Sequence, residues 1–256
     1  MNGNLPTKKP LNYPGFFVVF EGIDGAGTTT QAGPLTERIK RLNKYHDILD
    51  THEPWKAPQI DKILRRDSDP NTKKEEMTRL FTDMRKDHTQ NLISPSLEEG
   101  IIVVSDRYTL STCAYQEAQG VSLQRIVDLH KTGNILIPNV TYLIDAPAEV
   151  CIGRIGHRAG EREKFEETDF LEKVRKNYLD LSVRAGRRDY GGLFGEVVLI
   201  DGGNSIPEVA KAVSSDFKYR YRDWIKDVSE YESSSGEQLA FDLWGTDSGK
   251  ANSDPI

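Results

Sequence analysis

The chain has 256 residues, of which 37% are hydrophobic and 29% charged, and its formal net charge is −6. This modest net charge argues against a disordered chain, and the length allows one large or two small domains. The acidic balance disfavours broad non-specific binding to nucleic acid, which needs a basic surface. No stretch approaches the roughly 20 apolar residues that cross a bilayer, and residues 1–10 lack the apolar core of a signal peptide. The two cysteines form no CxxC pair or disulfide framework, so we expect a cytoplasmic protein.

Short apolar runs that resemble strands alternate with longer amphipathic segments along the chain. The predicted strands are Phe16–Glu21, His46–Thr51, Gly100–Ser105, Val140–Asp145 and Glu196–Ile200. Three of them are rich in Val and Ile with little alternation, which is typical of strands buried on both faces of a parallel sheet. The clearest helical segment runs from about Thr72 to Leu97. This alternation predicts an α/β sheet with helices on both sides.

The two ends of the chain differ in composition from its middle. Residues 1–14 carry three prolines and little apolar content, and the segment from Ser229 is rich in Ser, Gly, Asp and Glu. Within that segment, Leu239–Trp244 is an apolar island that either docks on the body or a partner or belongs to a tail without function. We therefore predict an N-terminal arm over residues 1–14, one domain over residues 15–228 and a tail over residues 229–256.

A glycine-rich turn, EGIDGAGTTTQ, directly follows the first predicted strand and leads into a helix. Phosphate-binding loops need this context, because backbone N–H groups and the helix N-terminus can then face phosphate oxygens. Gly22 and Gly27 fit the motif G-x-x-x-x-G-K-[ST], and Thr29 takes the place of the hydroxyl residue that reaches Mg²⁺. A glycine-rich turn without a ligand is the alternative. The predicted phosphate-binding residues are Gly22, Gly25, Ala26, Gly27, Thr28, Thr29 and Thr30.

The lysine of this motif is replaced by Thr28. Losing one preorganised charge at a developing anion costs on the order of 10²–10³ in rate, so catalysis would need another cation. The segment Gly153–Glu167 is basic and contains glycines, as expected of a mobile lid that closes over a triphosphate. A solvated helix end of mixed charge is the alternative. We hypothesise that the missing charge comes from Arg158, Arg162 or Lys164.

Three further segments favour a nucleotide site. The third predicted strand ends in SDRY, which places Asp106 and Arg107 where α/β sheets bind ligands, unless the pair only caps a helix. The segment STCAYQ (Ser111–Gln116) carries hydroxyl, phenol and amide groups suited to reading a base edge. Phe81 and Arg85 lie four residues apart on one helical face, where they suit a base and its 5′-phosphate. Their alternative is a core phenylalanine beside a solvated arginine.

In chain order, from about Phe16 to Asp227, these segments resemble the thymidylate kinase family of nucleoside monophosphate kinases. The phosphate loop FEGIDGAGTTTQ matches except at the lysine, and His52–Pro54 matches the family's Arg-Glu-Pro segment with His in the place of Arg. LFTDMRKDH matches the family's Phe–Arg helix, and DRYTLSTCAYQ its acceptor-site motif. The lid pattern Asp-Arg-x-Glu appears here as Glu163–Glu166.

The resemblance implies a P-loop NTPase fold with a five-stranded parallel sheet, and a homodimer that transfers the γ-phosphoryl of ATP to dTMP with Mg²⁺. Asp24 would contact the acceptor sugar or position the phosphates, Phe81 would stack on thymine, and Asp106 with Thr29 would organise Mg²⁺. Arg85 and Arg107 would hold the acceptor's 5′-phosphate. The remaining implied substrate contacts are Glu53, Pro54, Ser111, Thr112, Tyr115 and Gln116.

Two other functions stay open at this point. One is a kinase for another pyrimidine acceptor, such as dUMP, a 5-modified dUMP or a deoxynucleoside. The other is a nucleotide-binding protein that lost turnover together with the lysine. Arg85 and Arg107, the pair expected to hold the 5′-phosphate, favour a monophosphate over a free nucleoside as the acceptor.

Overall fold

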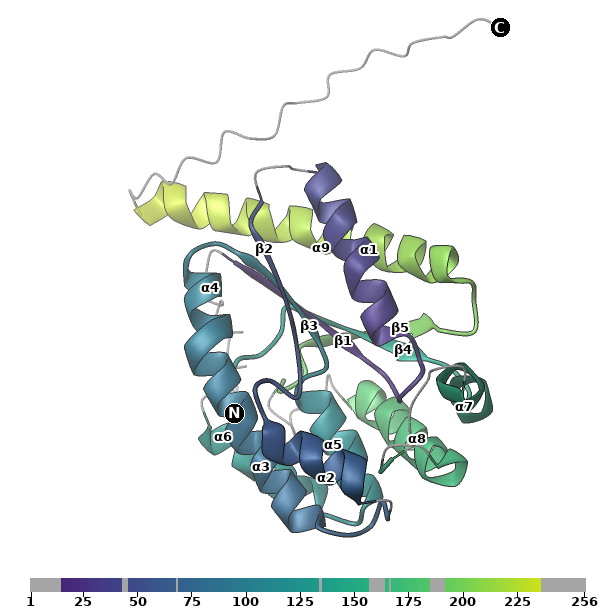
Figure 1. Ribbon diagram of the computed structural model, residues 1–256. Coiled ribbons are helices and arrows are strands. Elements are labelled where there is room, and N and C mark those ends of the chain that lie inside the picture. Colours follow the sequence, from purple (N-terminus) through teal and green to yellow (C-terminus); the bar gives the residue numbers. More distant parts are fainter. Residues whose placement is uncertain are drawn as a thin grey trace, which may run out of the picture. The chain divides into compact units, whose positions relative to one another are not determined.

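The computed structural model describes residues 15–42, 46–67, 69–133, 135–156, 164–165, 167–184 and 192–235. Its framework is a parallel five-stranded sheet with the strand order β2-β3-β1-β4-β5 (Figure 1). The strands are β1 (Phe16–Glu21), β2 (Ile48–His52), β3 (Ile102–Asp106), β4 (Val140–Asp145) and β5 (Glu196–Asp201). The predicted α/β fold with a five-stranded parallel sheet is therefore confirmed.

The strand bounds agree with the sequence except at β2, β3 and β5, which lie or end slightly further along the chain than predicted. At β3 the reason is the turn that precedes it. Gly100 has a φ of 82°, outside the extended region, so regular pairing begins only at Ile102. The two central strands, β1 and β4, lie where the sequence predicts them.

Helices connect the strands and cover both faces of the sheet (Figure 1). In Figure 1, α1 lies above the sheet, and α5 and α8 lie below it. α5 packs along α8. The bounds of the helices that join the strands are α1 (Thr28–Leu42), α2 (Pro58–Arg66), α3 (Lys74–His88), α4 (Ser94–Glu98), α5 (Thr109–Ala118), α6 (Leu123–Thr132), α7 (Ala148–Gly156) and α8 (Thr168–Arg184).

The long helical segment predicted from Thr72 to Leu97 is a continuous helical run with a π-helical turn inside it. α3 passes into the π-turn η1 (Thr89–Ile93) and then into α4. Pro95 carries no N–H and cannot donate the next regular helical bond, which is a reason for the change of pitch. Ile93 and Leu97 from this run pack into a core with residues of β1 and β3.

The last helix, α9 (Ile206–Ser235), spans two compact units of the chain, which divide between Ser215 and Asp216. In the first unit, the carbonyl of Ile206 accepts a bond of 3.2 Å from Nε2 of Gln31. In the second, the rings of Phe217, Tyr221 and Trp224 stack in series, with centroids 5.4 and 6.1 Å apart. α9 continues past residue 228, because no Gly or Pro follows Pro207 of its first turn.

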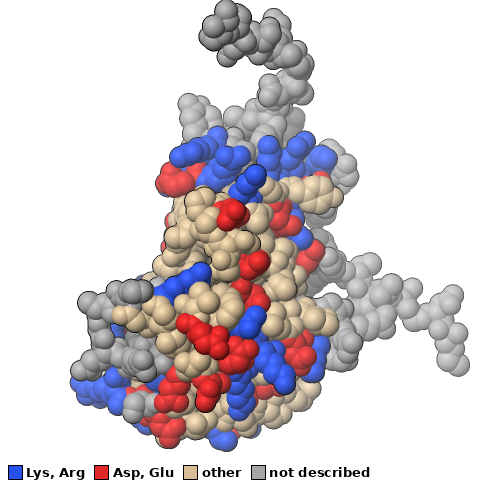
Figure 2. Space-filling view, turned by 90° about the vertical axis from the view of Figure 1, so that its right-hand side faces the viewer, with Lys and Arg blue, Asp and Glu red and all other residues tan. Residues whose placement is uncertain are grey.

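The predicted arm over residues 1–14 and the apolar island Leu239–Trp244 lie outside the described residues, so the predicted domain bounds stay predictions. Over the lower part of the face in Figure 2, lysines and arginines are intermingled with aspartates and glutamates. No helix in the described part of the chain is long and apolar enough to cross a membrane.

Candidate active site

The predicted phosphate loop connects β1 to the first turn of α1, and two of its glycines have positive φ. Gly25 has a φ of 84°, and a Cβ there would lie 2.4 Å from the carbonyl oxygen of Cys151. Gly27 has a φ of 103°, but a Cβ there would meet no heavy atom within 4 Å. Both backbone conformations favour glycine. Of the two, Gly27 faces open space, which suits a ligand that approaches the backbone of the loop.

Thr29 and Asp106, the two residues that the resemblance assigns to Mg²⁺, meet at the carboxyl edge of the sheet. The hydroxyl of Thr29 donates a hydrogen bond to Oδ2 of Asp106, which ends β3. The other carboxylate oxygen, Oδ1, is buried and has no hydrogen-bond partner. A buried carboxylate oxygen without a partner is costly in a protein, so this atom is suited to a ligand of opposite charge. Thr28, in the place of the lysine, is itself buried.

Arg107 joins the phosphate loop to the rest of the pocket. Its φ of 71° is a strained value for a residue with a side chain, at a cost of about 1–2 kcal/mol. The strain aims its guanidinium at the loop, where Nη2 pairs with Asp24 at 2.5 Å and Nη1 donates to the carbonyl of Gly22 at 3.0 Å. The other oxygen of Asp24 accepts a bond of 2.9 Å from the hydroxyl of Tyr115. The loop acid and the strand-end arginine are thus one connected group.

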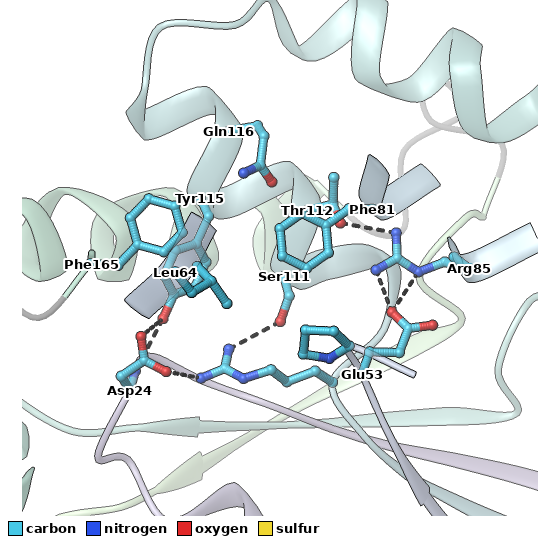
Figure 3. A pocket seen from close by; sticks show the side chains of 12 residues that line it. Asp24, Glu53, Leu64, Phe81, Arg85, Ser111, Thr112, Tyr115, Gln116 and Phe165 are labelled. Atoms are coloured by element: carbon cyan, nitrogen blue, oxygen red, sulfur yellow. Dashed lines mark hydrogen bonds and ion pairs between the residues drawn. The ribbon is translucent and has the colours of Figure 1, made fainter. Parts of the chain in front are cut away.

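One pocket gathers all of the predicted substrate-binding residues together with Asp24 (Figure 3). They come from the phosphate loop, the segment after β2, α3, the segment after β3, and α5. Two lining residues, Leu64 at the end of α2 and Phe165 before α8, were not predicted. Leu64 belongs to no motif and Phe165 takes the unspecified position of the lid pattern, so only the tertiary structure reveals that both line the pocket. The lining residues are Asp24, Glu53, Pro54, Leu64, Phe81, Arg85, Arg107, Ser111, Thr112, Tyr115, Gln116 and Phe165.

Arg85 is buried rather than solvated, with an exposure of 1%. Nε and Nη2 both donate to Oε2 of Glu53, and Nη2 also donates to the carbonyl of Tyr108 at 2.9 Å. Nη1 contacts Thr112 Oγ1 at 2.9 Å and His130 Nε2 at 2.7 Å. A guanidinium has five N–H donors, so protein atoms occupy all of them. The alternative of a solvated Arg85 is therefore wrong. A contact between Arg85 and a substrate phosphate requires the exchange of one of these partners.

Two histidines complete this buried group. His88 Nδ1 lies 3.2 Å from Oε1 of Glu53, and its ring stacks on Trp55 with centroids 5.0 Å apart. Burial, and then the charge of Arg85, lower the pKa of His130 to about 3. His130 is therefore neutral at physiological pH, and its Nε2 accepts from Arg85 while Nδ1 donates to the carbonyl of Ile126 at 2.7 Å. The contacts of His88 lie within this buried group, which indicates a structural role for it.

Glu21, the last residue of β1, organises the start of α5, a role that was not predicted from the sequence. Its Oε1 accepts backbone N–H bonds from Tyr108 at 2.9 Å and from Ser111 at 3.1 Å. Its Oε2 accepts from the hydroxyls of Ser111, at 2.5 Å, and Tyr178, at 3.1 Å. Burial raises the pKa of Glu21, opposed chiefly by the bond from Ser111 and by Arg107. An acid directly before the loop glycine was the available signal.

The candidate lid cations fall in two places. Arg158 and Arg162 lie outside the described residues. The ammonium of Lys164 is buried against the turn between α2 and α3, where Asp67 accepts from it at 2.8 Å. A cation that does reach the phosphate loop is Arg154 of α7. Its Nη1 lies 3.4 Å from the carbonyls of Gly25 and Ala26.

Comparison with known proteins places this geometry in a family. Residues 20–188 match the family described as thymidylate kinase. The chain belongs to the thymidylate kinase family. It is 36% identical over 179 residues to a thymidylate kinase of Wolbachia pipientis subsp. Culex pipiens, covering 67% of this chain and 83% of that protein. It is also 36% identical over 209 residues to a thymidylate kinase of Dinoroseobacter shibae, covering 79% and 96% of the two chains.

A third relative extends the comparison. The chain is 36% identical over 176 residues to a probable thymidylate kinase of Thermococcus kodakarensis, covering 65% of this chain and 83% of the relative. Membership in the thymidylate kinase family identifies the chain as a nucleoside monophosphate kinase, a phosphotransferase that uses ATP. Within this family, the chain departs from the phosphate-loop motif at Thr28, which stands in the place of the lysine.

Proposed function

We propose that this protein transfers the γ-phosphoryl group of ATP to dTMP, giving dTDP and ADP. The observation that carries the proposal is the pocket beside the phosphate loop, where the residues of four separate sequence motifs come together. In this reaction an oxygen of the acceptor's 5′-phosphate forms a bond to the γ-phosphorus, and the bond from that phosphorus to the β-phosphate oxygen breaks. The protein's contribution is positioning and charge stabilisation.

The pocket supplies different groups for the two ends of the acceptor. Arg107 lies between Asp24 and Ser111, next to the phosphate loop, and holds the acceptor phosphate. Phe81 provides a ring for the base, since base–aromatic stacking contributes about 1–3 kcal/mol. Gln116 is fully buried, and its Oε1 has no hydrogen-bond partner, so this atom accepts from an N–H of the base edge. Tyr115, bonded to Asp24, lies against the sugar.

Mg²⁺ fits the pair Thr29 and Asp106. Among the described residues no three His, Cys, Asp or Glu side chains gather into a metal site. Mg²⁺ in kinases needs only one or two protein ligands, because substrate phosphates and water supply the others. Asp106 Oδ1 and the hydroxyl of Thr29 are the oxygens available here. When bound, the ion neutralises charge on the β- and γ-phosphates.

We assign the work of the missing lysine to Arg158 or Arg162, by resemblance to lids that carry arginine. Lys164 is the third candidate from the sequence, but its three N–H donors are taken by the α2–α3 turn. Assembly as a homodimer and a cytoplasmic location are also proposed from the resemblance. Sedimentation of the purified protein tests the first, and tagging in cells tests the second.

One observation favours a second candidate function. Since Thr28 removes a charge worth on the order of 10²–10³ in rate, a protein that binds dTMP and ATP without turnover is the alternative. A kinase for another pyrimidine monophosphate, such as dUMP or a 5-modified dUMP, uses the same pocket and forms a variant of the first proposal.

Steady-state ADP formation from ATP and Mg²⁺ tests the proposal, with dTMP, dUMP, dCMP, dGMP and thymidine as acceptors. We expect turnover with dTMP, at a kcat/KM at least tenfold above any other acceptor. Thr28→Lys is measured beside the wild type. Turnover that appears only in Thr28→Lys, with dTMP binding intact in both, would establish the binding protein instead. Preference for dUMP over dTMP would reassign the acceptor.

A further inference from the structure

Two residues in the wall of the acceptor pocket come from segments about 100 residues apart in the sequence. They are Leu64, at the end of α2, and Phe165, before α8. Figure 3 shows both on the side of the pocket where Asp24 and Tyr115 lie. Phe165 is buried and packs on the rings of Phe170 and Tyr115, with centroids 5.3 Å away in each case. Contacts outside the sheet must hold these two segments together, because neither segment is part of a strand.

Lys164 makes that connection. Its backbone N–H donates to the carbonyl of Leu64 at 2.9 Å. Its ammonium donates to Oδ2 of Asp67 at 2.8 Å, to Oγ1 of Thr72 at 2.8 Å and to the carbonyl of Asp69. The side chain is completely buried. All three ammonium donors are therefore bound within one turn, and the lysine has no donor left for a phosphate.

The turn that receives the ammonium is itself fixed. The hydroxyl of Thr72 donates to Asp67, and the backbone N–H of Asn71 donates to Oδ1 of Asp69 at 2.8 Å. Gln119, just after α5, donates to the carbonyl of Pro70. The bond from Lys164, and then that from Thr72, lower the pKa of Asp67 to about 2, so the carboxylate is charged throughout the neutral range.

We propose that Lys164 is a positioning residue for the acceptor, because its bonds to Asp67, Asp69 and Thr72 hold Phe165 and Leu64 together as one wall of the pocket. The inference rests on the proposed function and deepens it. It assigns Lys164 to the dTMP side of the reaction and not to the triphosphate. Loss of these bonds loosens this wall of the pocket against the acceptor and leaves the phosphate loop unchanged.

The test compares Lys164→Met, Asp67→Asn and the double variant with wild type in steady-state kinetics. Methionine keeps the volume and the unbranched shape of lysine without its charge. We expect each single variant to raise KM for dTMP about tenfold while KM for ATP changes less than twofold. Because Lys164→Met already removes the bond to Asp67 that Asp67→Asn weakens, the double variant should show no more than the larger single effect. Lys173→Met, which removes a lysine of α8 outside the pocket, is the matched control and should behave as wild type.

Equilibrium binding of dTMP without ATP, measured by calorimetry, gives the second readout. The same tenfold weakening is expected in Lys164→Met, with an unchanged Kd in Lys173→Met. An unchanged affinity for dTMP, with a lowered kcat or a raised KM for ATP, would overturn the proposal and place the lysine at the triphosphate. A lower melting temperature with unchanged constants for dTMP would also overturn it. If the wild type binds dTMP but does not phosphorylate it, the proposed function fails, and the ratio of the Kd values still decides the role of Lys164.

Discussion

The two halves of the active site differ in how their charged groups are satisfied. In the acceptor half, the guanidinium of Arg85 has all five donors bound by protein atoms, and the carboxylate of Glu53 lies between Arg85 and His88. In the phosphate half, Oδ1 of Asp106 is buried without a partner, and Gly27 faces open space. The charged groups around Arg85 are therefore paired within the protein, whereas we propose that ligands of the phosphate half supply the charge that Asp106 lacks.

The largest effect is expected from a substitution that removes the buried arginine of the acceptor half. Arg85→Met leaves the carboxylate of Glu53 buried and without its arginine, and we expect the free energy of unfolding to fall by about 3–5 kcal/mol. Urea denaturation of the purified protein measures the change. Arg175→Met is the control, because its pair with Asp145 is partly exposed and should lose only about 1 kcal/mol or less. Equal losses in the two variants would contradict the internal pairing of the acceptor half.

A somewhat smaller effect tests the phosphate half. Asp106→Asn removes the charge from the oxygen that has no partner, so we expect kcat to fall by on the order of 10²–10³, with KM for dTMP within twofold of wild type. Asp145→Asn is the control at the end of strand β4, on the other side of β1, where both carboxylate oxygens already bind Arg175. A normal kcat in Asp106→Asn would show that the charge of Asp106 has no role in the reaction.

The last effect is small at any one pH, because it is spread over several pH units, and it sharpens the comparison through pH. Burial, and then Arg85, lower the pKa of His130 to about 3. The unfolded chain, with a histidine pKa near 6.5, binds one more proton than the folded protein between these values. The folded protein therefore loses stability as the pH falls from about 6.5 towards 3, by at most about 1.4 kcal/mol per pH unit. His130→Asn should flatten this part of the stability profile, measured by denaturation between pH 4 and 7. The same slope in the variant and the wild type would show that another group titrates.

The sequence predicted those parts of the site that sit on short motifs. The order of strands and helices along the chain and the place of the phosphate loop follow from local spacing, and the rule that α/β sheets bind ligands at the carboxyl ends of their strands placed Asp106 at the same edge. The hydrogen bond between Thr29 and Asp106 was not predicted. Except for Leu64 and Phe165, the residues that line the acceptor pocket were also predicted, through the phosphate loop, the motifs after β2 and β3, and those on α3 and α5. The hydrogen-bond partners of these side chains could not be predicted from the sequence, as Arg85 illustrates. Its place on a helix face gave no sign that protein atoms occupy every donor.

By itself, the sequence determined the fold class, the family and the position of the missing phosphate-loop lysine, because each depends on residues close together in the chain. Only the tertiary structure decided where the long cationic side chains end. Lys164 lies 97 residues from Asp67, and Arg85 lies 32 residues from Glu53. Charges in a basic segment look alike in sequence. Burial separates them, since a desolvated cation is stable only where the fold brings it a full set of acceptors.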